Sequence, residues 1–240
     1  MFEDQYNDQM EAEIQRLEAE KLAMEAGHQA VRKIVSRKYW IFDLDGTLTV
    51  AVHDFKAIKE ALEIPFEADI LEHLEALPRE ESVRLHRKLD LIERDLSQKT
   101  APASGAIELL SLLAQDGCRI GILTRNTHEI ARLTLKSTGL DEYFPEPSYI
   151  IGRNEAVPKP DPQGALHLAA LWGVPPEDMV VTGDYLYDLL CGRSIGAATI
   201  HVDPAGEFRW SEFSDLRVSS LQELAAMRQQ HGGGGDLNSC

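Results

Sequence analysis

Apolar positions along the chain follow two periods, and the change from one to the other predicts a parallel α/β sheet. Short apolar runs that end in glycine or acid are typical of buried parallel strands, whereas apolar residues spaced three or four apart predict helices. From residue 106 onward the two patterns alternate, as they do when helices connect parallel strands. The predicted strands are 39–43, 119–124, 148–151, 179–183 and 198–202, and the predicted helices of this part are 106–115, 127–137, 162–172, 185–195 and 221–228.

A purely helical pattern interrupts this order between the first two strands. Asp54 is a suitable N-cap for a first helix that ends before Pro65, a second helix ends before Pro78, and a third follows it. A short segment of small residues and proline then leads back to the main domain. The predicted ranges are 39–53 and 101–228 for the core, and 54–100 for a small helical cap inserted into it.

The two ends of the chain have different patterns from the middle. Residues 1–38 are acidic and rich in helix formers, and Met10, Ile14, Leu17 and Met24 fall on one helical stripe. This predicts an N-terminal helical extension that packs on the domain, with a dimerisation helix as the alternative, so that a monomer and a homodimer are both open. The glycine-rich stretch 229–240 is typical of a flexible tail.

Charge and cysteine content narrow the range of functions. The chain has 24 Lys and Arg against 40 Asp and Glu, a formal charge of −16. This argues against non-specific binding to nucleic acid or to an anionic membrane, because both would repel it. No apolar run approaches the ~20 residues of a membrane span, and the acidic N-terminus is unlike a secretory signal. Cys118, Cys191 and Cys240 are too scattered for a disulfide framework, and the first two are expected to be buried thiols in a reducing cytoplasm.

Two acidic residues follow the first predicted strand directly. In the sequence Ile-Phe-Asp-Leu-Asp-Gly-Thr, backbone alternation is expected to place Asp43 and Asp45 on the same side of the sheet edge. Two carboxylates that lie so close need a cation or a proton between them. A divalent metal suits such oxygen ligands, and one carboxylate could then act as nucleophile and the other as acid and base.

Three later segments also carry polar residues where a predicted strand ends. The second strand is followed by Thr124, Arg125 and Asn126, a later loop contains Lys159, and the fourth strand ends in Gly-Asp-Tyr-Leu-Tyr-Asp, which supplies Asp184 and Asp188. Each residue alone has an ordinary explanation as a helix cap or a solvated side chain. Because ligands bind outside the carboxyl ends of parallel strands, their joint placement predicts one functional site.

These segments resemble the four motifs of the haloacid dehalogenase superfamily of phosphohydrolases. The motifs are Asp-x-Asp-Gly-Thr, a strand-end threonine, a lysine, and Gly-Asp-x-x-x-Asp, and they extend over residues 39–202. The resemblance implies a Rossmann-like parallel sheet core, with the helical insert standing where this superfamily has its first cap. The branch most similar to this chain is the phosphoglycolate-phosphatase-like one.

The resemblance also implies a role for each motif residue. Asp43 attacks phosphorus and becomes an aspartyl-phosphate, while Asp45 protonates the leaving oxygen and later takes a proton from water. Mg²⁺ is held by Asp43, by the backbone carbonyl of Asp45 and by Asp184, and Asp188 supports the metal directly or through water. Phosphoryl oxygens are bound by Thr124 and Lys159, with backbone N–H groups near Leu44 and Arg125 as further donors.

Some positions depart from the pattern or stay open. Arg125 stands where relatives commonly have a neutral residue, so it either binds substrate phosphate or faces solvent. Tyr185 replaces a small polar residue and either narrows the rim or is neutral. Candidate substrate contacts near and on the cap, for which a solvated face is the competing explanation, are His53, His73, Arg84, Arg87 and Arg94.

The leading hypothesis is a Mg²⁺-dependent phosphatase that acts on a small phosphorylated metabolite of the cytoplasm. A phosphomutase on the same scaffold is the closest alternative. A dehalogenase is disfavoured because it has no use for the metal carboxylates. A receiver-type signalling domain is disfavoured by the helical insert after the nucleophile, and a non-catalytic phosphate-binding module by the complete set of motifs.

Overall fold

The computed structural model describes residue 16, residue 18, residues 21–22 and residues 24–232. The chain forms two compact units, one of residues 37–225 and one of residues 1–36 together with 226–240. Among the described residues, no helix has both the length and the apolar character that a bilayer crossing requires.

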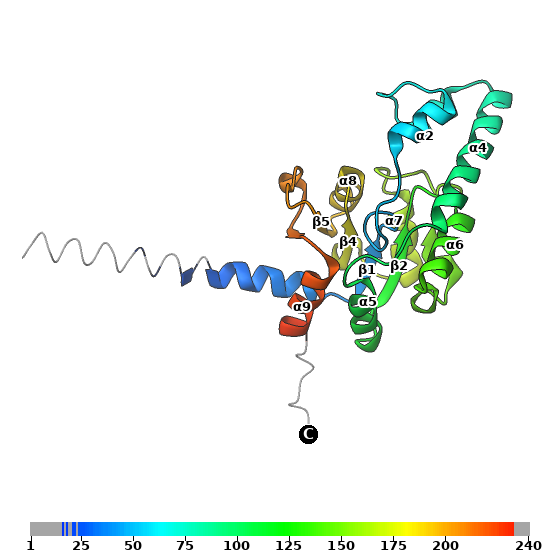
Figure 1. The fold of residues 1–240 in the computed structure, drawn as a ribbon. Coiled ribbons are helices and arrows are strands. Elements are labelled where there is room, and N and C mark those ends of the chain that lie inside the picture. The colour runs from blue at the N-terminus through cyan, green and yellow to red at the C-terminus, as the bar shows by residue number, and fades with distance from the viewer. Residues whose placement is uncertain (1–15, 17, 19–20, 23, 233–240) are drawn as a thin grey trace, which may run out of the picture. The chain divides into compact units, whose positions relative to one another are not determined.

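A six-stranded parallel sheet forms the centre of the larger unit, which confirms the predicted α/β fold (Figure 1). The strands in chain order are β1 (Tyr39–Phe42), β2 (Arg119–Leu123), β3 (Ile150–Ile151), β4 (Met179–Gly183), β5 (Ala198–Val202) and β6 (Leu216–Val218). In space their order is β3-β2-β1-β4-β5-β6. The short strand β6, with its single exposed residue Arg217, was not predicted, because three residues among polar neighbours give too weak a pattern.

Strand β1 lies between β2 and β4, and its burial follows from this position. Trp40, Ile41 and Phe42 are fully buried. Ile41 packs with Val181 of β4 and with Trp172 in one hydrophobic cluster. A strand that is covered on both faces needs a continuous apolar run, and this is what the sequence supplies.

The helices that connect the strands begin and end within a few residues of the predicted positions. They are α5 (Ala106–Gln115), α6 (His128–Thr138), α7 (Gln163–Trp172), α8 (Leu186–Ser194) and α9 (Leu221–Gly232). Short 3-10 turns lie between them at Asp141–Tyr143, Pro147–Tyr149, Pro176–Asp178 and Ser211–Phe213. The turn at Pro147–Tyr149 takes up the start of the predicted third strand, so that β3 is shorter than expected.

Three helices stand between β1 and α5, and we call them the cap helices. They are α2 (Phe55–Leu62), α3 (Ile70–Ala76) and α4 (Arg79–Ser97), and Figure 1 shows α2 and α4 beyond the carboxyl end of β1. The side chains of Asp54 and Asp69 cap α2 and α3, and the three helices share their own apolar cluster around Leu62, Leu74 and Leu89. The division of the chain into a core and a separately acting cap stays a prediction.

The two chain segments that lead into and out of the cap helices are hydrogen-bonded to each other. The N–H of Val50 donates to the carbonyl of Ala101 at 2.9 Å, and the N–H of Ala103 donates to the carbonyl of Leu48 at 2.9 Å. The hydroxyl of Thr100 also donates to the carbonyl of Val50 at 2.8 Å. We call residues 48–50 and 100–103 the cap stalk.

In the smaller unit, residues 24–35 are helical, and the guanidinium of Arg228 donates to the carbonyl of Val35. Met24 is 58% exposed, and the other residues of the predicted N-terminal stripe lie outside the described residues. Helix α9 continues to Gly232 instead of ending at residue 228, so the predicted tail is helical at its start. Residues 233–240 lie outside the described part of the chain.

The two cysteines that the structure describes differ in their surroundings. Cys191 is buried as predicted, and burial raises the pKa of its thiol to about 12. Cys118 is only half-buried, with its thiol directed to the carbonyl of Arg37, so its prediction as a buried thiol was wrong. It lies in the turn just before β2, where the sheet no longer covers it.

Candidate active site

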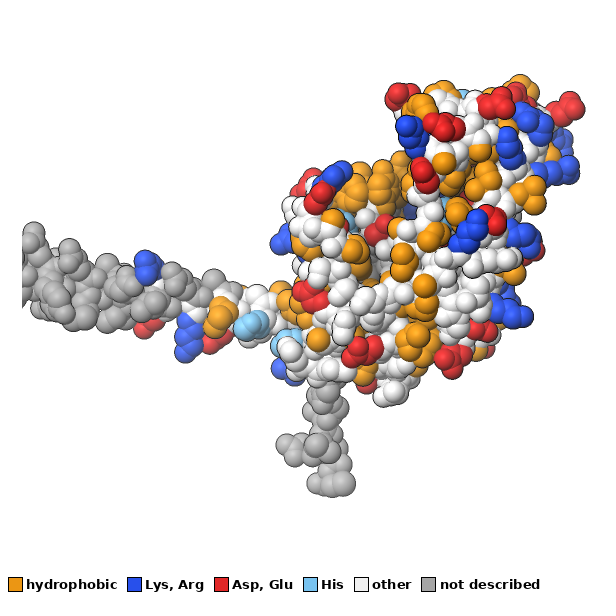
Figure 2. All heavy atoms as spheres, viewed as in Figure 1, with side chains coloured by type: hydrophobic (Ala, Val, Ile, Leu, Met, Phe, Trp, Pro, Cys, Tyr) orange, Lys and Arg blue, Asp and Glu red, His pale blue; other side chains and the backbone are white. Residues whose placement is uncertain are grey.

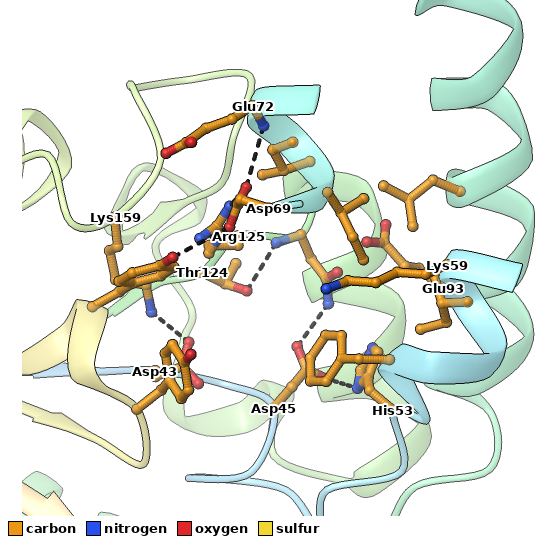
Figure 3. Close-up of a pocket in the computed structure, with 18 of the residues that line it drawn as sticks. Asp43, Asp45, His53, Lys59, Asp69, Glu72, Glu93, Thr124, Arg125 and Lys159 are labelled. Carbon is orange, nitrogen blue, oxygen red and sulfur yellow. Dashed lines mark hydrogen bonds and ion pairs between the residues drawn. The ribbon is translucent and has the colours of Figure 1, made fainter. Parts of the chain in front are cut away.

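A cavity of about 620 Å³ lies between the carboxyl ends of the strands and the cap helices (Figure 3). All the site residues that the sequence predicts line this cavity: Asp43, Asp45, Thr124, Arg125, Lys159, Asp184 and Asp188. The sheet brings them together. The N–H of Asp43 donates to the carbonyl of Thr182 at 2.9 Å, which aligns the end of β1 with the end of β4. Segments distant in sequence therefore end at one edge of the sheet.

Three carboxylates form a cluster at the bottom of the cavity. Asp43, Asp184 and Asp188 each offer an oxygen, and these oxygens all lie within 4.8 Å of one another. The side chain of Asp45 is not part of this cluster. A cation shared by Asp43 and Asp45, and a metal bond from the backbone carbonyl of Asp45, stay predictions.

Lys159 neutralises part of this cluster. Its Nζ lies 2.5 Å from Oδ1 of Asp43 and 2.6 Å from Oδ1 of Asp188, and its side chain is only 4% exposed. Burial alone would lower the pKa of Lys159, but the charges of Asp188 and Asp43 outweigh it and hold the pKa above its ordinary value. The lysine therefore carries a permanent positive charge next to the carboxylate of Asp43.

One lysine does not balance three carboxylates, of which Asp188 is buried and Asp43 and Asp184 are half-buried. Burial, followed by repulsion from Asp43 and Asp188, raises the pKa of Asp184 to about 8. Burial raises the pKa of Asp188 to about 6, and burial also raises the pKa of Asp43. A compact set of carboxylate oxygens with excess negative charge is the donor chemistry that Mg²⁺ takes in proteins, so these residues fit the metal that the sequence motifs imply.

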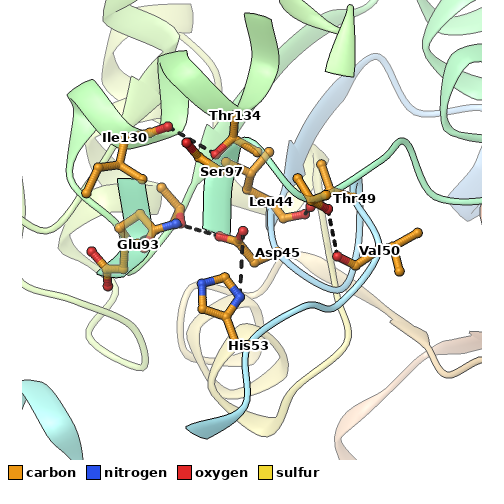
Figure 4. Close-up of polar contacts among 12 residues, drawn as sticks. Leu44, Asp45, Thr49, Val50, His53, Glu93, Ser97, Ile130 and Thr134 are labelled. Carbon is orange, nitrogen blue, oxygen red and sulfur yellow. Dashed lines mark hydrogen bonds and ion pairs between the residues drawn. The ribbon is translucent and has the colours of Figure 1, made fainter. Parts of the chain in front are cut away.

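Asp45 is held separately from the cluster. Its Oδ2 accepts a hydrogen bond from Nδ2 of Asn126 at 2.7 Å, and its Oδ1 lies 4.0 Å from Nδ1 of His53 (Figure 4). Burial raises the pKa of Asp45 to about 6, although Lys159 opposes this shift. A carboxyl group that titrates near neutrality can both give and take a proton, which is what a general acid and base requires.

Gly46 leaves the space in which Asp184 stands. Its φ is +90°, and a Cβ on it would lie 2.4 Å from Oδ2 of Asp184. The other oxygen of Asp184 accepts a hydrogen bond from the hydroxyl of Thr47 at 3.2 Å. The Gly-Thr pair that follows Asp45 thus fixes the position of a carboxylate from another strand.

We expect Gly46→Ala to weaken Mg²⁺ binding by about tenfold or more, since the new methyl group must displace Asp184 from the cluster. Titration calorimetry measures the affinity. Gly117→Ala is the matched control, because Gly117 also has a positive φ of +67° but nothing within 4 Å of its Cβ position. Equal Mg²⁺ affinity in the two variants would contradict the placement of Asp184 in the metal site.

Arg125 has a partner that the sequence did not predict. Its guanidinium pairs with Oδ1 of Asp69, the N-cap of α3, at 2.6 Å, and lies over the ring of Tyr187 with its centre 4.8 Å away. It lines the cavity, and its role in binding phosphate stays a prediction. Asp69 could be foreseen from the sequence only as a helix cap, since it precedes an apolar helical pattern.

A second core-to-cap contact carried no signal in the sequence. The side chain of Arg153, 4% exposed, lies after β3 and forms ion pairs with Glu93 at 2.8 Å and with Asp90 at 2.6 Å, both on α4. It also donates to the carbonyl of Arg125 at 2.8 Å. The partners are about 60 positions apart along the chain, and nothing in the local pattern of either segment indicates the pairing.

Of the candidate substrate contacts near and on the cap, only His53 lines the cavity. Arg84 and Arg94 instead lie near Glu81 and Glu129 respectively, at 4.0 Å and 2.6 Å. His73 and Arg87 do not line the cavity either. The ring of Tyr185, half exposed on the cavity wall, meets Tyr187 and Trp210 edge-on, and its effect on the width of the rim stays a prediction.

Comparison with known proteins identifies the family. The sequence model of the haloacid dehalogenase-like hydrolases matches residues 38–196, which is more than half of the chain. The chain belongs to the haloacid dehalogenase-like hydrolase family. This membership confirms the resemblance drawn from the four motifs.

The relatives include phosphatases. A haloacid dehalogenase-like hydrolase domain-containing protein of Arabidopsis thaliana is 29% identical over 77% of this chain and 80% of its own length. A phosphoglycolate phosphatase of Thiobacillus denitrificans is 30% identical over 55% of this chain and 59% of its own length. The crystal structure of a hydrolase from Pseudomonas syringae matches with a TM-score of 0.68 and 25% identity, over 81% of this chain and 99% of that one. The chain is therefore a phosphatase-like hydrolase of this family.

Proposed function

We propose that the protein is a Mg²⁺-dependent phosphatase that hydrolyses a phosphomonoester of a small metabolite through an aspartyl-phosphate. The observation that carries this proposal is the buried cluster of Asp43, Asp184 and Asp188 with Lys159 in contact with two of the three carboxylates. Phosphoryl transfer depends mainly on positioning and on neutralising charge, and this cluster supplies both beside an open cavity.

In the proposed reaction, an oxygen of Asp43 attacks phosphorus and the bond to the leaving alcohol breaks. Asp45 gives its proton to the leaving oxygen. It then takes a proton from the water that attacks the aspartyl-phosphate, which releases phosphate and restores Asp43. Lys159 and Thr124 bind the phosphoryl oxygens. Mg²⁺, held by Asp43, Asp184 and Asp188 with the backbone carbonyl of Asp45, would neutralise the negative charge shared by nucleophile and substrate.

The test is hydrolysis of a chromogenic aryl phosphate by the purified chain, with Mg²⁺ and with EDTA. Release of phosphate that requires Mg²⁺ and no bisphosphate activator supports the phosphatase and separates it from the phosphomutase alternative. Folded protein with no turnover in either condition would contradict the proposal and favour a module that only binds phosphate.

We expect Asp45→Asn to lower turnover by ~10² to 10⁴-fold, the usual contribution of a general acid and base. An aryl leaving group needs little protonation, so the first half of the reaction suffers less than the second. A rapid burst of leaving group followed by a stall is the expected progress curve, with phosphate on Asp43 detectable by mass spectrometry.

Asp54→Asn is the matched control for this variant, because it makes the same change at the N-cap of α2, where asparagine also caps well. Normal turnover by Asp45→Asn would remove Asp45 from the reaction.

A further inference from the structure

The wall of the cavity that lies away from the phosphatase residues carries more acid than base. Its ionisable residues are Glu67, Asp69, Glu72 and Glu93 against Lys59 and Arg125. Glu67 and Glu72 are exposed side chains, and Figure 3 shows Glu72 and Asp69 together on the cap side of the cavity. On the face of the cap helices that Figure 2 shows, acidic and basic side chains are interspersed.

Of the two cations of this wall, Arg125 is already neutralised by an ion pair. Arg125 is 2.6 Å from the carboxylate of Asp69, and its other face is covered by the ring of Tyr187. The hydroxyl of Tyr187 points to the second oxygen of Asp69 at 3.5 Å. Burial would raise the pKa of Asp69, but the hydrogen bond and charge of Arg125 outweigh it and hold the pKa below its ordinary value. Both side chains are therefore charged and bound to each other at neutral pH.

Lys59 keeps its positive charge, and its Nζ donates to the carbonyl of Phe66 at 2.6 Å. Glu93 is paired with Arg153. The distal part of a ligand therefore meets the exposed carboxylates of Glu67 and Glu72 and the aromatic ring of Tyr185, together with Lys59.

On the basis of the phosphatase activity proposed above, we infer that this cavity selects a phosphomonoester whose leaving alcohol carries no second negative charge, and that the Asp69–Arg125 pair enforces the selection. A second carboxylate or phosphate would be desolvated beside the exposed carboxylates of Glu67 and Glu72, while Arg125 is already paired with Asp69 and Lys59 is held at the carbonyl of Phe66. Hydroxyl or ammonium groups would instead donate hydrogen bonds to the carboxylates. A cavity of about 620 Å³ holds a leaving group larger than glycolate.

The first experiment compares kcat/KM, with Mg²⁺, for three phosphomonoesters of similar size and different charge. They are 2-phosphoglycolate with a carboxylate, glycerol 1-phosphate without further charge, and phosphoethanolamine with an ammonium group. We expect the last two to exceed 2-phosphoglycolate by about tenfold or more, as for charge interactions in a partly buried site. Equal or better hydrolysis of 2-phosphoglycolate overturns the inference.

The aryl phosphate assay separates this outcome from failure of the proposed function. Turnover of the aryl ester with a preference for 2-phosphoglycolate overturns the selectivity alone. Absence of any turnover overturns the phosphatase, and the selectivity with it.

The second experiment removes the negative charge that pairs with Arg125. In Asp69→Asn the side-chain carbonyl can still accept the N–H of Glu72 and cap α3, but the charge that neutralises Arg125 is gone. We expect the kcat/KM ratio of 2-phosphoglycolate to glycerol 1-phosphate to rise by about tenfold. An unchanged ratio overturns the role of the pair.

Two further variants make this result specific. Adding Arg125→Gln to Asp69→Asn should return the ratio to its wild-type value, because the released cation is then absent. Glu75→Gln is the matched control, since it removes an exposed carboxylate from the same helix without changing the cavity wall. The inference is overturned if the kcat/KM ratio of 2-phosphoglycolate to glycerol 1-phosphate also rises in the double variant or in Glu75→Gln.

Discussion

Asp43→Asn is expected to reduce turnover of an aryl phosphate by ~10⁴-fold or more while the protein stays folded, as for loss of a catalytic nucleophile. The amide cannot attack phosphorus, but it has the shape of the carboxylate and keeps one oxygen toward the cluster. Because Asp43 is buried and repels Asp184, the variant should be at least as stable as the wild type without metal. Steady-state kinetics and thermal unfolding with and without Mg²⁺ measure the two effects.

Asp188→Asn distinguishes loss of the nucleophile from loss of a metal ligand. It removes a carboxylate of the same cluster, so its activity should recover partly at high Mg²⁺ concentration, whereas that of Asp43→Asn should not. Activity of Asp43→Asn within tenfold of the wild type would assign the nucleophile to another residue.

Lys159→Met is expected to be the most damaging change to stability. Methionine has nearly the same length, but it leaves Asp43 and Asp188 buried without their cation. Removing one partner of a buried ion pair costs about 3–5 kcal/mol in the free energy of unfolding. Catalysis should also fall by ~10²-fold or more, because a positive charge at the phosphoryl group is lost.

The pH dependence of the stability of Lys159→Met shows whether the carboxylates left without their cation cause the loss of stability. A carboxyl whose pKa is raised in the folded state stabilises the fold while it is protonated, and this stability is lost as the pH rises through the folded pKa. The pKa of Asp184 is 3.8 in its ordinary state and about 8 in the folded protein. In EDTA, the wild type should therefore already lose stability as the pH rises between these two values. Lys159→Met should lose more stability than the wild type over the same pH range, and Mg²⁺ should restore part of the lost stability.

Urea unfolding at pH 5 and pH 8 measures this difference. Lys99→Met is the matched control, because Lys99 pairs with Asp95 at the surface, where 61% of its side chain is exposed, and such pairs contribute ~0–1 kcal/mol. If Lys159→Met were no more destabilising than Lys99→Met, Lys159 would not neutralise the buried cluster.

The sequence predicts the sheet and the gathering of the motif residues because both depend on local patterns. A run such as Trp40–Phe42 can only be a buried strand, and parallel strands must present their carboxyl ends at one edge. The direction of the Asp45 side chain could not be predicted in this way, since it is set by a turn. Its partner Asn126 follows a different strand, and only the sheet order brings the two together.

The contacts between core and cap lie furthest from what the sequence predicts. Two ion pairs make these contacts, one between Arg125 and Asp69 and one between Arg153 and Glu93. Each pair joins two segments whose separation in space depends on how α3 and α4 pack. A charged residue on a helix is usually solvated, and no spacing distinguishes one that reaches a partner on another segment. For the same reason, the sequence suggested His73 and Arg87 as substrate contacts and missed Asp69.

The cap stalk has a consequence for how such a protein can diversify. Because Val50 and Ala101 are joined by a backbone hydrogen bond, the inserted segment begins and ends at almost the same point in space. An insert of another length or architecture grafted there needs only two adjacent attachment points, and the entropy of closing a loop grows slowly with its length. Recombination at this junction can therefore replace the part of the cavity wall that comes from the cap helices and leave the carboxylate cluster intact.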